Sequence, residues 1–327
     1  MSARRVVTLA AAAVLAAAPG FAAPTLWERT RDPAAARAER ALRRLERIFD
    51  GVVQAEGDLQ MMQDFRLGTL AIAEMSGAHA FTQPRLRLLL ARVLIEADIG
   101  REEQAAELAR AVLDRLAPGE VWLEAEARVV LAAAAKTPEA SLREIARALP
   151  LAWHPGTRSS LLRRRADAHM ARGDVLASVA DYRAAIPATG FAAESALARF
   201  GLAVALERSG NLPAALEELR LARLIAPRVH GAELGVLSLP GVFAFRPWDT
   251  HYAIALAELG AIPGAADTSA AALSCEKAMA GFQEYLAAAP PSDSWSPAAR
   301  AHLKALEPTC RTLREQAPRV EDDEPEE

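Results

Sequence analysis

The six histidines are the residues of this sequence whose types could support metal binding or acid–base chemistry. No two of them lie three or four residues apart, and no His-Glu-x-x-His segment occurs, so the spacing that lets one helix hold a metal ion is missing. His169 falls on the inward side of a predicted helix, where we expect it to pack against its neighbours. His251 has more suggestive neighbours, because Trp248 and Tyr252 lie beside it. The sequence predicts no catalytic residue, no cofactor and no metal site.

Acidic residues are plentiful, but they recur beside arginines on predicted helix faces, which is typical of solvated helix surfaces. A glycoside hydrolase would need two carboxylates fixed in a cleft, and nothing in the sequence indicates such a pair. The chain has 42 acidic and 38 basic residues, so no excess of positive charge favours nucleic-acid binding. We therefore predict a protein that is not an enzyme and that does not bind nucleic acid.

The two cysteines, Cys275 and Cys310, lie in the last predicted repeat and in the terminal helix. In an oxidising compartment an even pair of cysteines favours a disulfide, which would tie the end helix to the rest of the chain. Two buried free thiols are the alternative, since the sequence does not give the distance between them.

The first residues predict export. Arg4 and Arg5 precede an apolar run over residues 6–18, and small residues near 20–23 offer a cleavage site. The run is shorter than the ~20 residues that a membrane span needs, although an N-terminal anchor helix remains the alternative. No cysteine follows the run, so a lipoprotein anchor is not expected. We predict a signal peptide over residues 1–23 and a periplasmic or secreted protein with no membrane span after cleavage.

The elements that organise the rest of the chain are two copies of one helix-turn-helix unit. Residues 160–172 and 175–186 form the first predicted pair, with a break at Gly173, and residues 193–209 and 212–225 form the second, with a break at Gly210. The two break glycines are 37 residues apart. Small residues recur at the same offsets from each break, namely Ala166 and Ala203, Ser178 and Ala215, and Ala185 and Ala222.

This pattern resembles the tetratricopeptide repeat (TPR), which has small residues where its helices cross and a large residue on its second helix, here Tyr182 or Leu219. The second copy, closed by Pro227, is the better match, whereas Gly190 stands where the closing proline of the first copy belongs. The resemblance implies an all-α fold, a right-handed TPR-like helical solenoid of about five or six helix pairs with a non-helical insertion before the last repeat.

The predicted organisation follows this period along the chain. In order, we expect a tether at 24–32, an N-terminal helical pair at 33–82, TPR-like repeats at 83–227, an aromatic-rich insertion at 228–249, the last repeat and a capping helix at 250–316, and a disordered acidic tail at 317–327.

The resemblance also implies where a partner would bind, because the first helices of such repeats line a concave groove. The groove positions of the two copies are Arg163, Asp167, Met170, Phe200, Val204 and Glu207. Phe200 and Val204 would form an apolar patch that either the insertion or a peptide ligand could fill, and a glutamate at either position should abolish partner capture in a folded protein. The implied function is a non-enzymatic, exported protein–protein interaction scaffold that holds a segment of an unidentified partner protein, in cell-envelope assembly or organisation.

The insertion is the second candidate site. Four of the 17 aromatic residues fall within ten positions there, and the full candidate set is Phe243, Phe245, Trp248, His251 and Tyr252. One interpretation is a plug that covers apolar helix surface and buries its own aromatics. The other is a partner-binding hot spot, since Trp and Tyr are enriched at such sites. The alternative function is a cell-wall glycan-binding protein or an envelope enzyme that uses these side chains.

Overall fold

The computed structural model describes residues 87–88, 90–92, 101–116, 118–189, 192–226, 234–238 and 243–317. Within these ranges the chain is all-α, with three short 3-10 turns and no strand. The predicted signal peptide, tether, N-terminal helical pair and acidic tail lie outside the described residues, except that the tail's first residue, Ala317, ends the last helix. No helix among the described residues is long and apolar enough to cross a membrane.

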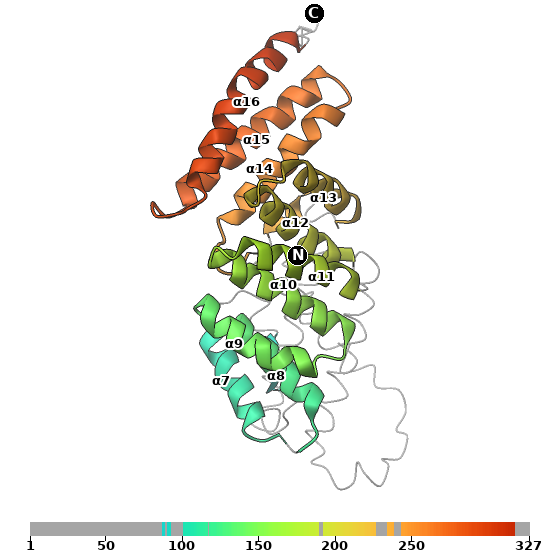
Figure 1. Cartoon of the computed structure of the whole chain (residues 1–327), viewed down its shortest axis with the longest axis vertical. Helices are drawn as coiled ribbons and strands as arrows, with labels where there is room; N and C mark the ends of the chain where they lie inside the picture. Colours follow the sequence, from blue (N-terminus) through green and yellow to red (C-terminus); the bar gives the residue numbers. More distant parts are fainter. Residues whose placement is uncertain are drawn as a thin grey trace, which may run out of the picture. The chain divides into compact units, whose positions relative to one another are not determined.

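The chain divides into two compact units, residues 1–161 and 162–327. In the first, the structure describes α7 (Glu102–Leu113), α8 (Val121–Ala133), α9 (Pro138–Ala148) and the short turn η1 (Leu149–Leu151). Helix α8 packs against both α7 and α9 (Figure 1). Alanine dominates the contacts, which lets the helix axes approach closely: the buried residues of α7 are Ala105, Ala106, Ala109 and Val112.

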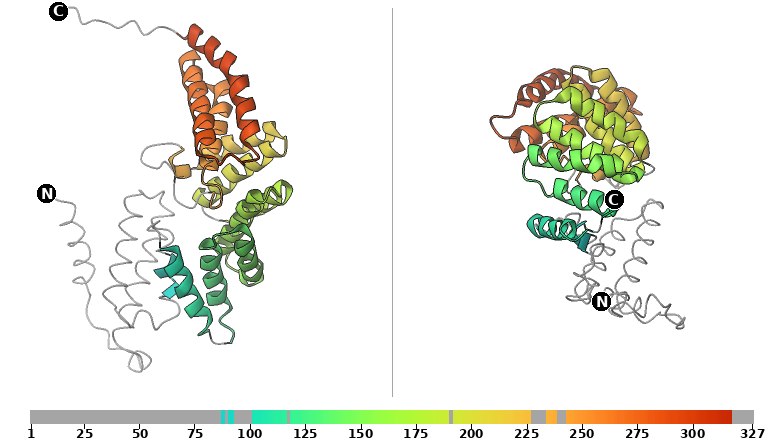
Figure 2. Two further views of the ribbon diagram at one scale, coloured as in Figure 1. Left: turned by 90° about the vertical axis from the view of Figure 1, so that its left-hand side faces the viewer. Right: turned by 60° about the horizontal axis from the view of Figure 1, so that its bottom comes forward.

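The second unit begins inside α10 (Pro155–Ala171) and continues through α11 (Val175–Ala188), α12 (Ala192–Arg208) and α13 (Leu212–Ile225). After the turn η2 (Gly235–Ser238) come α14 (Asp249–Ala261), η3 (Ile262–Gly264), α15 (Thr268–Ala288) and α16 (Ser296–Gln316). From α11 onward each helix packs against the next, and α12 also contacts α14. Figures 1 and 2 show α14, α15 and α16 lying side by side.

The two predicted helix breaks have the same structure. Gly173 and Gly210 have φ angles of 81° and 86°, a left-handed conformation that glycine adopts without a steric penalty. In each case the next residue donates its backbone N–H to the carbonyl five residues back, Asp174 to His169 and Asn211 to Leu206, both at 2.9 Å. This is the Schellman arrangement, which satisfies carbonyls at the end of a helix. The repeat of 37 residues seen in the sequence is therefore a repeat of local geometry.

The repeat positions pack as the sequence pattern predicts. All of the positions expected to be small are completely buried: Ala166, Ser178, Ala185, Ala203, Ala215 and Ala222. Tyr182, the expected large residue, lies so close to Gly201 that a Cβ there would be 2.3 Å from the tyrosine ring. Only glycine therefore allows α11 and α12 to approach at this point.

Several boundaries differ from the prediction. The first helix of the first copy was predicted to begin at residue 160, but α10 begins at Pro155. Proline suits the first position of a helix because its fixed φ is already helical and no partner is needed for the missing N–H. Helix α13 has the predicted bounds. Thr137 caps α9 by accepting a hydrogen bond from the backbone N–H of Ala140 at 3.2 Å.

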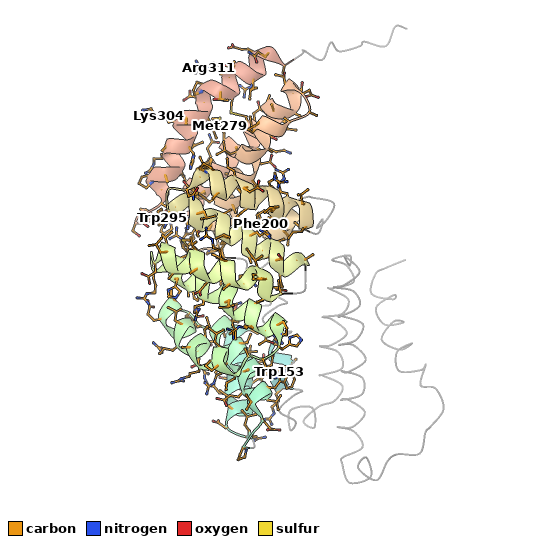
Figure 3. The ribbon with its side chains drawn as sticks, turned by 45° about the vertical axis from the view of Figure 1, so that its right-hand side comes forward. Trp153, Phe200, Met279, Trp295, Lys304 and Arg311 are labelled. Atoms are coloured by element: carbon orange, nitrogen blue, oxygen red, sulfur yellow. A yellow bond between two sulfur atoms is a disulfide. The ribbon has the colours of Figure 1, made fainter. Side chains whose placement is uncertain are left out.

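Helix α16 has one buried stripe and a polar outer face. Ser296, Ala299, Leu306 and Cys310 are buried on the side that packs against α15. Lys304 and Arg311 are exposed and lie on the outer side of the helix (Figure 3). A terminal helix with this pattern closes the apolar surface of α15 from solvent, which is what a capping helix requires.

Candidate functional site

A group of buried, alternating charges joins the helices of the second unit. Both oxygens of the Asp249 carboxylate accept hydrogen bonds from Arg208, at 2.7 and 2.8 Å. The side chains of these two residues are 0% and 1% exposed. Arg246 donates to Asp249 at 2.9 Å and also pairs with Asp293. The order arginine, aspartate, arginine, aspartate leaves no charge in this row without a partner, which a buried ionic group requires.

Helix ends and the turns between helices position these four charges. Arg208 is the last residue of α12 and Asp249 is the first residue of α14, so each sits where the helix dipole stabilises its charge. Asp293 lies in the connection between α15 and α16, where it accepts hydrogen bonds from the backbone of Trp295 and the hydroxyl of Ser296, both at 3.1 Å. Arg246 comes from the turn that precedes α14. We call Arg208, Arg246, Asp249 and Asp293 the buried charge cluster.

Aromatic rings surround the cluster. Tyr252 packs edge-on against Phe282 and Tyr285, with ring centroids 5.3 and 4.9 Å apart. The Arg208 guanidinium lies over the rings of Tyr252 and Trp295, at 5.2 and 5.0 Å from their centroids. Such cation–π contacts stabilise an arginine that has been removed from water. Trp295 lies at the start of α16 in Figure 3.

A second set of polar contacts runs beside the cluster. His302 of α16 stacks on Phe282 with ring centroids 4.9 Å apart, and its Nε2 lies 2.8 Å from a carboxylate oxygen of Glu207. Glu207 also accepts a hydrogen bond from the Tyr252 hydroxyl at 2.8 Å. One carboxylate of α12 therefore links α14 and α16, which are far apart in the sequence.

Each of the three tyrosines in the chain donates its hydroxyl to a carboxylate. Tyr182 donates to Asp167, Tyr252 to Glu207 at 2.8 Å, and Tyr285 to Asp293 at 2.6 Å. Burial, together with the neighbouring carboxylate, raises the pKa of all three hydroxyls above the ordinary value. In all three pairs the carboxylate holds the hydroxyl proton in place.

We expect a tyrosinate titration to reveal these pairs. The folded protein should show no tyrosinate absorbance near pH 10, where tyrosine ordinarily ionises, and all three tyrosines should ionise together when alkali unfolds the chain. Because the folded-state pKa values are raised, stability is unaffected below about pH 10 and falls as the pH rises beyond it. Absorbance and far-ultraviolet circular dichroism measured on the same samples would test this. In urea the three should titrate normally, and a tyrosine that ionises near pH 10 in folded protein would contradict the structure.

The predicted groove residues are occupied by contacts within the chain. Arg163 lies 3.3 Å from Glu194 and 4.0 Å from Asp167. Burial raises the pKa of Asp167 despite the neighbouring Arg163. Met170, Phe200 and Val204 are 4%, 0% and 1% exposed. The structure therefore does not present Phe200 and Val204 as an open apolar patch, because both side chains are buried within the second unit.

The aromatic residues of the insertion are also packed down. Phe243 is 6% exposed and Tyr252 is completely buried, while Phe245 and Trp248 are half-buried. The Arg246 guanidinium lies over the Trp248 ring, 5.4 Å from its centroid. His251 is also half-buried and pairs with Glu284 at 2.9 Å. This arrangement corresponds to the plug interpretation.

Two other sequence predictions concern histidine and cysteine. No group of three or more His, Cys, Asp or Glu side chains among the described residues is placed to hold a metal ion. His169 is half-buried, with Asp174 and Asp181 as its acidic neighbours at 3.5 and 3.8 Å. Cys275 and Cys310 form a disulfide with a Cα–Cα distance of 5.5 Å, joining α15 to α16 as predicted.

None of the four residues of the buried charge cluster was predicted from the sequence. Glu207 and Asp167 were predicted as groove residues, whereas Arg208, Arg246, Asp249 and Asp293 were passed over. One signal was present: charged residues occur on both sides of Trp248, within the apolar part of the insertion. What the sequence did not show is that their partners lie 41 and 47 residues away.

A separate groove of about 480 Å³ lies in the first unit, between α7, the end of α8, and α9. Alanines form much of its lining, and equal numbers of acidic and basic side chains surround them: Glu103, Glu107, Glu144, Arg110, Lys136 and Arg143. This balance of charge favours no particular ligand.

No protein-family model matches the chain, and no curated protein sequence matches it.

Proposed function

We propose that this protein is a non-enzymatic, exported scaffold that binds a segment of a partner protein on α12 and α14, in the assembly or organisation of the cell envelope. The observation that carries the proposal is the repeated helical hairpin, with the same Schellman turn at Gly173 and Gly210 and the same buried small residues. Helices stacked in this way form extended surfaces rather than enclosed pockets. The resemblance to tetratricopeptide repeats and the predicted signal peptide supply the binding mode and the compartment.

The buried charge cluster supports a structural role in such a scaffold. Each of its four charges is paired with an opposite charge of the cluster, and Arg208 and Asp249 are inaccessible to a substrate. A catalytic acid or base needs access to a reacting group in addition to a suitable pKa. The cluster instead fixes the relative positions of α12, α14 and the start of α16, which a rigid binding surface needs.

The glycan-binding alternative is less well supported, because stacking on a sugar requires an exposed aromatic face. Tyr252 and Phe243 are buried, and an arginine covers the ring of Trp248. We therefore keep the protein partner as the proposed ligand.

In-cell crosslinking would test the proposal. The variant Phe200→Glu is not a suitable test, because a glutamate at this completely buried position is expected to unfold the protein. A photo-crosslinking residue at Leu197 of α12 or Ile254 of α14, both partly exposed, should capture one dominant protein identifiable by mass spectrometry. The same residue at Arg220 of α13 or Gln283 of α15, both exposed, is the matched control. Equal capture from all four positions, or recovery of glycan alone, would contradict the proposed function.

A further inference from the structure

The turn η2 behaves as a short peptide bound to the helices that line the predicted groove. It packs on both α12 and α14, the first helices of two successive hairpins. Its two aliphatic side chains, Val236 and Leu237, are 1% and 0% exposed. The turn has only four residues, Gly235–Ser238, and these two side chains provide its buried apolar surface.

The turn η2 lies on the two helices that the proposed function assigns to a partner. Helix α12 carries Phe200 and Val204, the two apolar groove positions, and both are completely buried or nearly so. Helices α12 and α14 are consecutive first helices in this part of the stack, and they contact each other directly. A partner segment with similar side chains would therefore compete with η2 for the same position.

Buried apolar side chains help to hold the described part of the insertion in place. The backbone N–H of Leu237 donates a hydrogen bond to the carbonyl of Leu234, just before η2, at 3.0 Å. Further along, Phe243 has a φ of 56°, a conformation that is unfavourable for a residue with a Cβ and that persists here with its ring 6% exposed. Local opening of a short connecting segment can require less free energy than unfolding of the helices it packs on.

We propose that residues 234–238 are an intramolecular ligand that occupies the partner-binding face of α12 and α14, and that a partner segment carrying two adjacent aliphatic side chains after a glycine displaces it. The inference rests on the proposed function for the existence of a partner. The occupation of this face by residues 234–238 is a property of this chain alone, and it can be tested without a partner. Binding of the partner is then controlled by the fraction of molecules in which the segment has separated.

A peptide added in trans provides the test. The full-length variant Val236→Ser/Leu237→Ser should leave the face unoccupied and bind a labelled peptide of residues 231–240 (GAELGVLSLP) about tenfold or more tightly than the natural chain does, because the internal competitor is gone. Fluorescence anisotropy would measure the affinity. The matched control is Leu224→Ser, which changes an exposed leucine of α13 and should bind the peptide no better than the natural chain. A peptide with serine at both aliphatic positions should not bind the variant.

Equal peptide affinity of the variant and the natural chain, or no binding to a variant whose circular dichroism shows it folded, would overturn the inference. If the variant does not fold, hydrogen exchange on the natural chain decides: the amides of residues 235–237 should exchange faster than those of α14, and equal protection would reject a detachable segment. Partner capture in cells is a separate result. Peptide binding without a captured partner would keep the inference and reject the proposed function, and capture without peptide binding would do the reverse.

Discussion

Replacing Asp249 with asparagine should lower the free energy of unfolding by about 3–5 kcal/mol, the usual cost of removing one partner of a buried ion pair. The carboxylate is 1% exposed and accepts hydrogen bonds from both Arg208 and Arg246. Asparagine keeps the size of the side chain but not its charge, so the fully buried Arg208 is left without a counter-charge. Urea unfolding followed by circular dichroism would measure the loss.

Two comparisons separate this effect from general sensitivity to mutation. Glu217→Gln breaks an ion pair with Arg220 in which both side chains are more than half exposed, and it should leave the unfolding midpoint nearly unchanged. The double variant Arg208→Met/Asp249→Leu removes both buried charges and should be more stable than Asp249→Asn. An Asp249→Asn protein that unfolds at the same urea concentration as the natural chain would show that the pair is not buried in solution.

Removing the disulfide should have an effect of similar size. The two cysteines are 35 positions apart, and the chain-entropy estimate for a loop of this length is about 4 kcal/mol. The variant Cys275→Ala/Cys310→Ala should therefore unfold at a clearly lower urea concentration. We expect unfolding to begin at α16, because the bond joins this terminal helix to α15. Hydrogen exchange along α16 should therefore become faster.

Reduction of the natural protein provides the control for this prediction. A reducing agent should lower the stability of the natural chain towards that of the double-alanine variant and should not affect the variant itself. Both cysteines are held in the bond, so the oxidised protein should not react with a thiol reagent either before or after unfolding. Thiol reactivity in unfolded, unreduced protein would show that the bond is absent.

The helices could be predicted from the sequence because their signals are local. A helix boundary depends on neighbouring residues, such as the glycine that ends α12 or the threonine that caps α9. The positions of the small residues follow from the helical period, which places them on one face. The start of α10 was not predicted correctly, because a proline favours a turn as readily as it favours the first position of a helix.

The sequence alone determined the helical hairpins and their shared turn, and it favoured a bond between Cys275 and Cys310, the only two cysteines present. It also showed that most charges lie on solvated faces, as Glu217 and Arg220 do on neighbouring positions of α13. Only the tertiary structure decided which charges leave the solvent. The partner of Arg208 is 41 residues away at the start of α14, and no local pattern connects them. The groove is a second example. The sequence shows that Phe200 is apolar, but only the packing of the whole unit decides whether the chain itself or a partner covers it.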